Sequence, residues 1–130
     1  HGYTYSGHPV GAAAALACLK ETKRLNVPEN AAARGAELYA GLQSLGAEFD
    51  VIGDIRGGHG LMCALELVSD RDTKASIDKA STATLQEAAY QNGAMVRISG
   101  PNVILSPPLI LTSDDVQVIL GALKSGFSAL

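Results

Sequence analysis

The spacing of apolar residues changes several times along this chain, and those changes constrain its fold more than any other feature. Before residue 46 and after residue 112, apolar side chains recur every three or four positions, which is typical of helices. Between residues 51 and 68, and again between 94 and 105, they form short runs or alternate with polar residues, which is typical of strands. This mixture predicts an α+β fold, with a small, mainly antiparallel sheet covered by helices on one face.

Prolines, glycines and capping residues set the expected boundaries. Four helices are expected. The first begins near Pro9, and the second has Asn26 or Val27 as its cap and ends at Gly46. The third spans 74–92, and the fourth begins at the capping sequence Thr112-Ser113-Asp114-Asp115. The expected strands span 51–55, 61–68, 94–98 and 103–105. In the second strand, the side chains expected to face away from the core are those of Met62, Ala64, Glu66 and Val68. The core candidates are Leu61, Cys63, Leu65, Leu67, Val96, Ile98, Leu120 and Leu123.

Composition excludes several classes of protein. The chain has 130 residues, of which 47% are hydrophobic and 18% charged, so it has the size and apolar content of one globular domain. Its net charge of −3 argues against nucleic acid and anionic membranes as partners. No apolar run approaches the roughly 18 residues of a membrane span. Its two cysteines fit buried thiols in a reducing compartment, so a cytoplasmic location is expected.

Two groups of residues raise the question of a metal or phosphate site, and neither pattern favours one. The histidines and cysteines lack the paired spacing of metal ligands, so no metal site is expected, and Cys18 is expected in the core. The glycine-rich segment Arg56–Gly60 lies between two expected strands and opens no helix. It therefore favours a tight hairpin turn over a phosphate cradle.

Two further features leave alternatives open. The leader Tyr3–Pro9 gathers phenols, hydroxyls and an imidazole ahead of a helix N-terminus, where an anion such as phosphate is favoured, although Ser6 could simply cap the helix. Arg97 lies inside an apolar run. It could grip a ligand carboxylate, form a structural ion pair or point outward from an edge strand.

Three stretches together resemble the C-terminal part of the class III aminotransferases, which are pyridoxal-phosphate (PLP) enzymes of fold type I. They are His1–Val10 with the Ala-rich helix that follows, Asp54–Leu67, and Val96–Ile110. They occur in the family's order and approximate spacing, and together they cover essentially the whole chain. The fold implied by this resemblance is that of the family's C-terminal small domain.

The resemblance also implies that important residues lie outside this sequence. In the family, the catalytic lysine that forms a Schiff base with the cofactor lies upstream of the position of His1, and no lysine here matches its motif. We therefore expect a piece of a longer protein that is inactive alone. Residues 1–27 are expected to form an interface segment and helix leading from a large domain, and residues 28–130 the small domain. The helix that carries Ala13–Ala17 is expected to expose an apolar face.

The implied activity is transfer of an amino group from an amine or ω-amino acid to an oxo acid such as pyruvate, in a homodimer. By resemblance, Thr4 contacts the PLP phosphate across the dimer, Tyr3 lines the same site, and Arg97 binds the substrate carboxylate. We expect Arg97 to end its strand and to be partly exposed, free to swing toward water. Ornithine-type members carry an arginine at the position of Ile104, so the pattern favours the amine–pyruvate group.

One position departs from that group, and two alternative functions remain open. The residue after Gly100 is often aspartate in the amine–pyruvate enzymes and is Pro101 here. The first alternative is another class III specificity, like that of diaminopelargonate synthase or an aminomutase. The second is a non-catalytic ligand-binding α+β module.

Overall fold

The computed structural model describes residues 2–130. His1, which opens the first family-like stretch and was considered as a metal ligand, lies outside the described residues. The elements in chain order are α1 (Pro9–Arg24), α2 (Val27–Glu48), β1 (Ile52–Arg56), β2 (Cys63–Asp70), β3 (Ala75–Ser76), α3 (Lys79–Gln91), β4 (Arg97–Ser99), β5 (Asn102–Leu105) and α4 (Ser113–Ser128).

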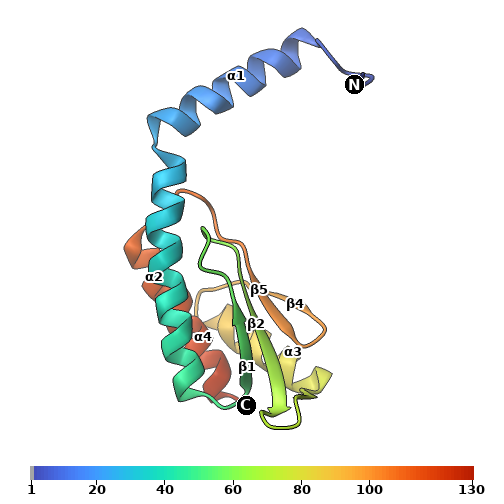
Figure 1. Cartoon of the computed structure of the whole chain (residues 1–130), viewed down its shortest axis with the longest axis vertical. Helices are drawn as coiled ribbons and strands as arrows, with labels where there is room; N and C mark the ends of the chain where they lie inside the picture. Colours follow the sequence, from blue (N-terminus) through green and yellow to red (C-terminus); the bar gives the residue numbers. More distant parts are fainter. Residues whose placement is uncertain (1) are drawn as a thin grey trace.

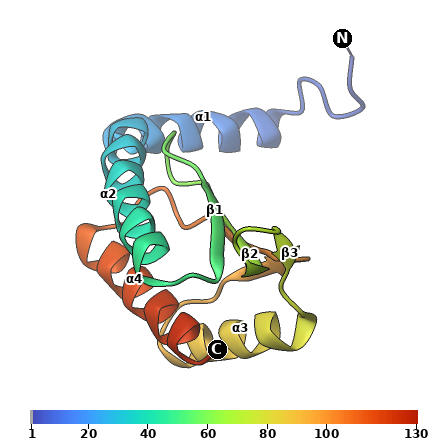
Figure 2. The same ribbon diagram turned by 60° about the horizontal axis from the view of Figure 1, so that its bottom comes forward.

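The strands form one open, antiparallel sheet. Its order is β1-β2-β5-β4, and the short β3 pairs with the end of β2. Helices α2, α3 and α4 lie on the same side of the sheet (Figures 1 and 2). The expected α+β fold, with helices on one face, is therefore confirmed.

The core lies between the sheet and these three helices. Leu65 of β2, Leu38 of α2 and Leu123 of α4 are completely buried there, and the ring centroids of Phe49 and Phe127 lie 5.4 Å apart. Six of the eight core candidates are buried, and the other two, Ile98 and Leu120, are partly buried and pack against the same cluster.

Val68 departs from the predicted alternation along β2, because it is buried although it lies outside the main core cluster. Gly53 of the neighbouring strand lacks a side chain, and a Cβ built there would lie 2.6 Å from Val68 Cγ1. Strand β3 pairs with Val68 from the other side. Val68 is therefore buried between β1 on one side and β3 on the other.

The predicted end of α2 at Gly46 is wrong, since the helix continues to Glu48. Ile55 of β1 packs over Gly46, and a Cβ built there would lie 2.7 Å from Ile55 Cδ1. The end of the helix is held from outside by the Arg71 guanidinium, which donates hydrogen bonds to the carbonyl oxygens of Gly46 and Phe49. A cation from a distant loop gives no local signal in the α2 sequence.

The helix predicted over 74–92 begins five residues later, at Lys79, and β3 occupies the start of that range. Thr73 donates its backbone N–H and hydroxyl to the Asp70 carboxylate, which forms a turn. The turn leads the chain back along β2 as β3. Asp78 then caps α3 by accepting from the Ser81 N–H. A polar turn followed by a two-residue strand has no hydrophobic period to reveal it.

Two other strands are displaced from their predicted ranges. β2 begins two residues later than expected because residues 57–62 all belong to the loop after β1, and it ends two residues later because Asp70 pairs with Ala75 of β3. β4 covers only Arg97–Ser99, so Arg97 begins its strand and does not end it. Ala94 and Val96 are buried before the strand starts, so their apolar character reflects burial in an irregular segment.

Helix α1 projects from the start of α2, away from the sheet and from α3 and α4 (Figure 1). None of its residues is buried, and Val10, Leu16 and Leu19 are more than half exposed. The expected exposed apolar face is therefore confirmed, whereas the expected burial of Cys18 is wrong, because this thiol lies on the exposed helix. Within residues 2–130, no helix combines the length and apolarity needed to cross a membrane.

Candidate functional site

Arg97 lies on a two-strand hairpin at the edge of the sheet. In this hairpin Arg97 pairs with Ile104 and Ser99 with Asn102, so Gly100 and Pro101 form the turn. Gly100 has a φ of 58°, which suits glycine at the first central position of a type II′ turn. The Pro101 carbonyl accepts a hydrogen bond of 2.9 Å from the Leu67 N–H. Pro101 is thus compatible with a regular hairpin that carries Arg97.

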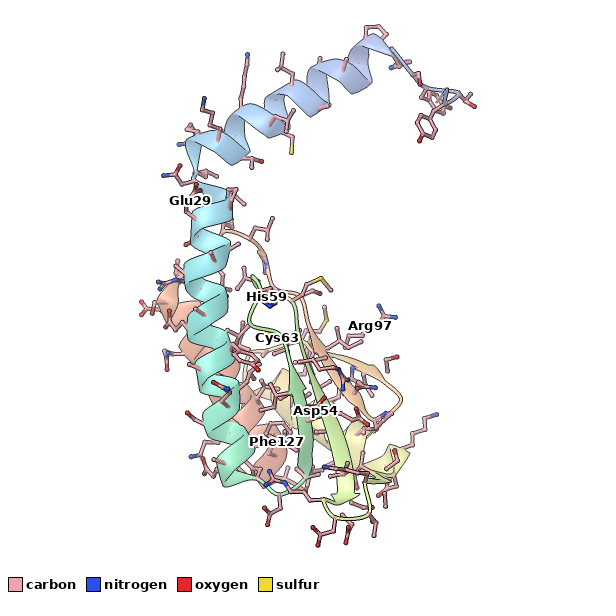
Figure 3. All side chains as sticks on the ribbon, viewed as in Figure 1. Glu29, Asp54, His59, Cys63, Arg97 and Phe127 are labelled. Carbon is pink, nitrogen blue, oxygen red and sulfur yellow. The ribbon has the colours of Figure 1, made fainter. Side chains whose placement is uncertain are left out.

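The Arg97 side chain is exposed at this edge and points away from the helices (Figure 3). Among residues 2–130 it has no ion-pair partner and no side-chain hydrogen bond. The structural ion pair considered for it is therefore absent from the described part of the chain. The outward-facing edge position and the expected exposure are both found.

A hollow of about 520 Å³ lies beside Arg97. The segment Gly93–Arg97 forms one wall, and residues 104–108, which include the Pro107-Pro108 pair, form another. Leu111 and Ile119 close it on the helix side. The two halves of the third family-like stretch therefore meet around one space. A guanidinium at the rim of such a hollow suits a small ligand with one acidic end and one apolar end.

A group of polar residues on the open face of the sheet connects the second family-like stretch to the Arg97 hairpin. Arg56 donates to the Glu66 carboxylate at 2.7 Å, to Asp54 at 2.9 Å and to the side-chain oxygen of Asn102. The hydrogen bond to Glu66 is the main cause of the raised pKa of Arg56. Asn102 in turn donates to the Ser99 carbonyl at 3.2 Å, across the turn after Arg97.

Sequence reasoning missed this group because it treated Arg56 only as the start of the glycine turn. The available signal was period-two spacing, which places Asp54 and Arg56 on the same face of one strand and Glu66 on the same face of the next.

The expected hairpin is found, since β1 and β2 are antiparallel neighbours, but its connection is not a tight turn: Arg56 ends β1 and the loop covers residues 57–62. Gly58 and Gly60 both have positive φ, and Gly58 lies against the Tyr39 ring of α2. Cys63 is buried just after this loop, and its desolvation raises the pKa of the thiol, which disfavours a nucleophilic role. Residues 2–130 contain no group of three or more side chains that could hold a metal ion.

The leader before α1 folds as a turn and is exposed. His8, and not Ser6, caps the helix, because its Nδ1 accepts from the Gly11 N–H at 3.4 Å. Ser6 instead accepts from the Tyr3 N–H at 3.0 Å, so the predicted alternative of a Ser6 cap is wrong. Within residues 2–130, the hydroxyl and backbone N–H of Thr4 have no hydrogen-bond partner.

The structure does not bring the leader and Arg97 together. Tyr3 and Thr4 precede α1, which projects from the domain, whereas Arg97 lies at the sheet edge (Figures 1 and 3). A site that used all three residues would need the leader of a different subunit, or a different position of α1 relative to the sheet.

This chain is similar to known proteins along nearly its whole length. The family described as Aminotransferase class-III matches residues 1–127. A taurine–pyruvate aminotransferase from Bilophila wadsworthia is 34% identical over 134 residues, covering 98% of this chain and 29% of that protein. A putrescine–pyruvate aminotransferase from Pseudomonas aeruginosa is 34% identical over 122 residues, covering 92% of this chain and 26% of that protein.

Solved structures show the same relationship. The amine transaminase of an uncultivated Pseudomonas species, in its PLP-bound form, is 45% identical and has a TM-score of 0.90, covering 98% of this chain and 29% of that one. The chain spans 26–29% of the length of these relatives, and the match lies in the C-terminal portion of the transaminase structures.

Proposed function

This chain belongs to the class III aminotransferases, PLP-dependent enzymes of fold type I, and we propose that its parent protein moves an amino group from an amine or ω-amino acid to an oxo acid such as pyruvate. The observation that carries this proposal is Arg97, an exposed cation without a described partner at the rim of a hollow. Two relatives, named for taurine with pyruvate and for putrescine with pyruvate, support the choice of acceptor.

The leader has the donor chemistry that a phosphate group needs. The Thr4 hydroxyl and N–H are both without a described partner, and two neighbouring donors of this kind can donate hydrogen bonds to the oxygens of one phosphate group. We assign Thr4 to the PLP phosphate and Tyr3 to the edge of the same site, in the partner subunit of a homodimer. When bound, PLP supplies the electron sink for the reaction, and the residues of this chain hold and orient it.

Arg97 is assigned to the oxo acid. Its planar guanidinium can donate two parallel N–H bonds to a carboxylate while the apolar walls of the hollow receive the rest of the molecule. The same pocket must also accept an amine that has no acidic group. A fixed, buried arginine would then be left unpaired at a cost of several kcal/mol. An exposed arginine at a sheet edge avoids this cost by turning toward water.

The remaining parts of the proposal concern the whole protein. Residues 28–130 are assigned to the small domain, and residues 1–27 to an interface segment that leads from a large domain. We expect no turnover from residues 1–130 alone, because the catalytic lysine is expected upstream of His1. The location proposed for the parent protein is the cytoplasm.

Steady-state kinetics of Arg97→Ala in the full-length, PLP-loaded protein would test the function. The KM for pyruvate should rise roughly 30- to 1000-fold, which corresponds to the loss of one bidentate charge-assisted contact of about 2–4 kcal/mol. The KM for a neutral arylalkylamine should change little. Lys124→Ala is a matched control, because Lys124 is an exposed cation paired with Glu48 on the helix surface. Equal losses for both substrates would assign Arg97 a structural role and overturn the proposal.

A further inference from the structure

Gln86 on α3 forms a hydrogen bond to the segment that leads into Arg97. Its Nε2 donates to the Val96 carbonyl at 2.9 Å, and this bond is partly buried. The Val96 carbonyl belongs to the peptide group that joins Val96 to Arg97. The Gln86 amide therefore contacts the backbone at the base of the arginine side chain, although the two residues lie on different elements.

The position of this peptide just before an edge strand explains why it needs a partner from a side chain. β4 is the last strand in the order β1-β2-β5-β4, so β5 is the strand that bonds to it and its other side is open. Val96 lies immediately before that edge strand. Backbone groups that point outward from an edge strand have no neighbouring strand to bond. The Gln86 amide supplies the donor there.

The rest of the approach to Arg97 is held at other points. The Ala94 N–H donates to the Ala89 carbonyl at 3.0 Å, which ties the start of the segment to the end of α3. The Val96 side chain is buried in the core. From Arg97 onward the chain is held by strand pairing, which begins with Arg97 opposite Ile104. The Gln86 bond is thus the polar contact that fixes the peptide between the buried valine and the exposed arginine.

Gln86 also lies between two hollows. It lines the hollow of about 520 Å³ beside Arg97 and a second one, of about 470 Å³, between α3 and the Gly100-Pro101 turn. Val96 and Arg97 both line the first hollow, so without the amide the peptide between them would border this open space with no side chain to hold it.

We propose that Gln86 is a positioning residue for Arg97: it fixes the peptide from which the arginine starts, so that the side chain swings about a stationary backbone. This inference rests on the proposed function, in which Arg97 binds the acid group of the oxo acid. In this proposal Gln86 contacts neither substrate nor cofactor, and it acts only by fixing the orientation of the Arg97 guanidinium.

The test compares Gln86→Met with Gln91→Met in the full-length, PLP-loaded protein. Methionine preserves the length of the side chain and removes the amide. Gln91 is a matched control on the same helix, because its amide bonds Glu87 one turn away at 2.7 Å and does not contact the segment before Arg97. Gln86→Glu is a second variant, since a carboxylate keeps the shape of the side chain but is charged and cannot donate to the carbonyl.

Gln86→Met should raise the KM for pyruvate about two- to tenfold, the range of one neutral hydrogen bond, and should leave the KM for a neutral arylalkylamine within about twofold. Gln86→Glu should shift the pyruvate KM in the same direction, and Gln91→Met should shift neither value. In an Arg97→Ala background, Gln86→Met should cause no further change, because the residue whose aim it controls is gone.

Two results would overturn this inference while the proposed function stands. One is an equal loss for both substrates. The other is an effect of Gln86→Met that persists in the Arg97→Ala background, since either would show a general structural role. A failure of the proposed function is recognised separately, by an Arg97→Ala variant that keeps its normal KM for pyruvate.

Discussion

Thr4 presents two hydrogen-bond donors on an exposed turn, and this is where a single residue can test the role of the leader. In the full-length protein, Thr4→Ala should weaken PLP binding by about 1–3 kcal/mol, the scale of a hydrogen bond to a charged group. Thr4→Ser, which keeps the hydroxyl, should retain most of the affinity. Equilibrium dialysis or titration followed by cofactor absorbance would measure both.

Thr22→Ala is the control for Thr4→Ala. Thr22 lies on α1, the helix that follows the leader. Its hydroxyl donates to the Cys18 carbonyl one turn back, so it is not available for a phosphate. If Thr4→Ala and Thr22→Ala bind PLP equally well, Thr4 does not contact the phosphate.

At the residue scale, the sequence was most informative where a charged side chain lies among apolar neighbours. Arg97 stood out because an arginine inside an apolar run needs an explanation, and its exposure at an edge strand provides one. The Gln86 contact to Val96 could not be foreseen, because it joins residues ten positions apart across a helix, a loop and a strand end. Glutamine on a helix surface is ordinary, and only the fold shows what its amide reaches.

At the element scale, the close contact between α2 and the loop after β1 depends on Gly35. A Cβ at this position would lie 2.2 Å from the Gly60 carbonyl oxygen, and the obstacle is backbone rather than a flexible side chain. Gly35→Ala should therefore lower the free energy of unfolding of the chain by about 1–3 kcal/mol, as overpacking does. Urea denaturation followed by circular dichroism would measure this.

Gly121→Ala provides the opposite case on α4. A Cβ at Gly121 meets nothing within 4 Å, so the higher helix propensity of alanine should stabilise the chain by up to about 1 kcal/mol. A Gly35→Ala variant as stable as Gly121→Ala would show that α2 and the loop can separate at little cost.

Element boundaries show which signals are local. The start of α4 was predicted correctly, because Thr112 and Asp115 cap each other's backbone N–H groups within four residues. The hydrogen bonds from Thr112 hold the pKa of Asp115 below its usual value. The end of α2 was missed because Arg71 reaches it from 25 residues away. Strand β3 was missed because it has two residues and no apolar period, although the Asp70 turn before it is local.

At the scale of the whole molecule, the sequence predicted the architecture better than its details. The change of apolar period required both helices and a sheet, and one apolar face per strand required a single helical layer. The exposed apolar face of α1 was expected from the family resemblance, but the direction of the helix in space was not. When none of a helix's residues is buried within its own chain, its sequence does not indicate in which direction it projects.

The exposure of α1 leads to a prediction about how stability is distributed. Because none of its residues is buried, removing residues 1–24 takes little apolar surface out of the folded core. The shortened chain should unfold cooperatively, with a free energy of unfolding within about 1 kcal/mol of that of the whole chain, roughly the effect of changes at exposed sites. Urea denaturation of both chains would measure the difference.

Hydrogen exchange in the intact chain tests the same idea without a deletion. An unsupported helix of 16 residues is marginal in water, so the amides of α1 should exchange much faster than those of α2, whose buried face includes Leu38 and Leu42. Slow exchange throughout α1, or loss of cooperative unfolding in the shortened chain, would mean that α1 belongs to the folding unit of residues 28–130. Fast exchange with a stable remainder would instead fit an α1 that becomes ordered against a separate surface, as expected for an interface segment.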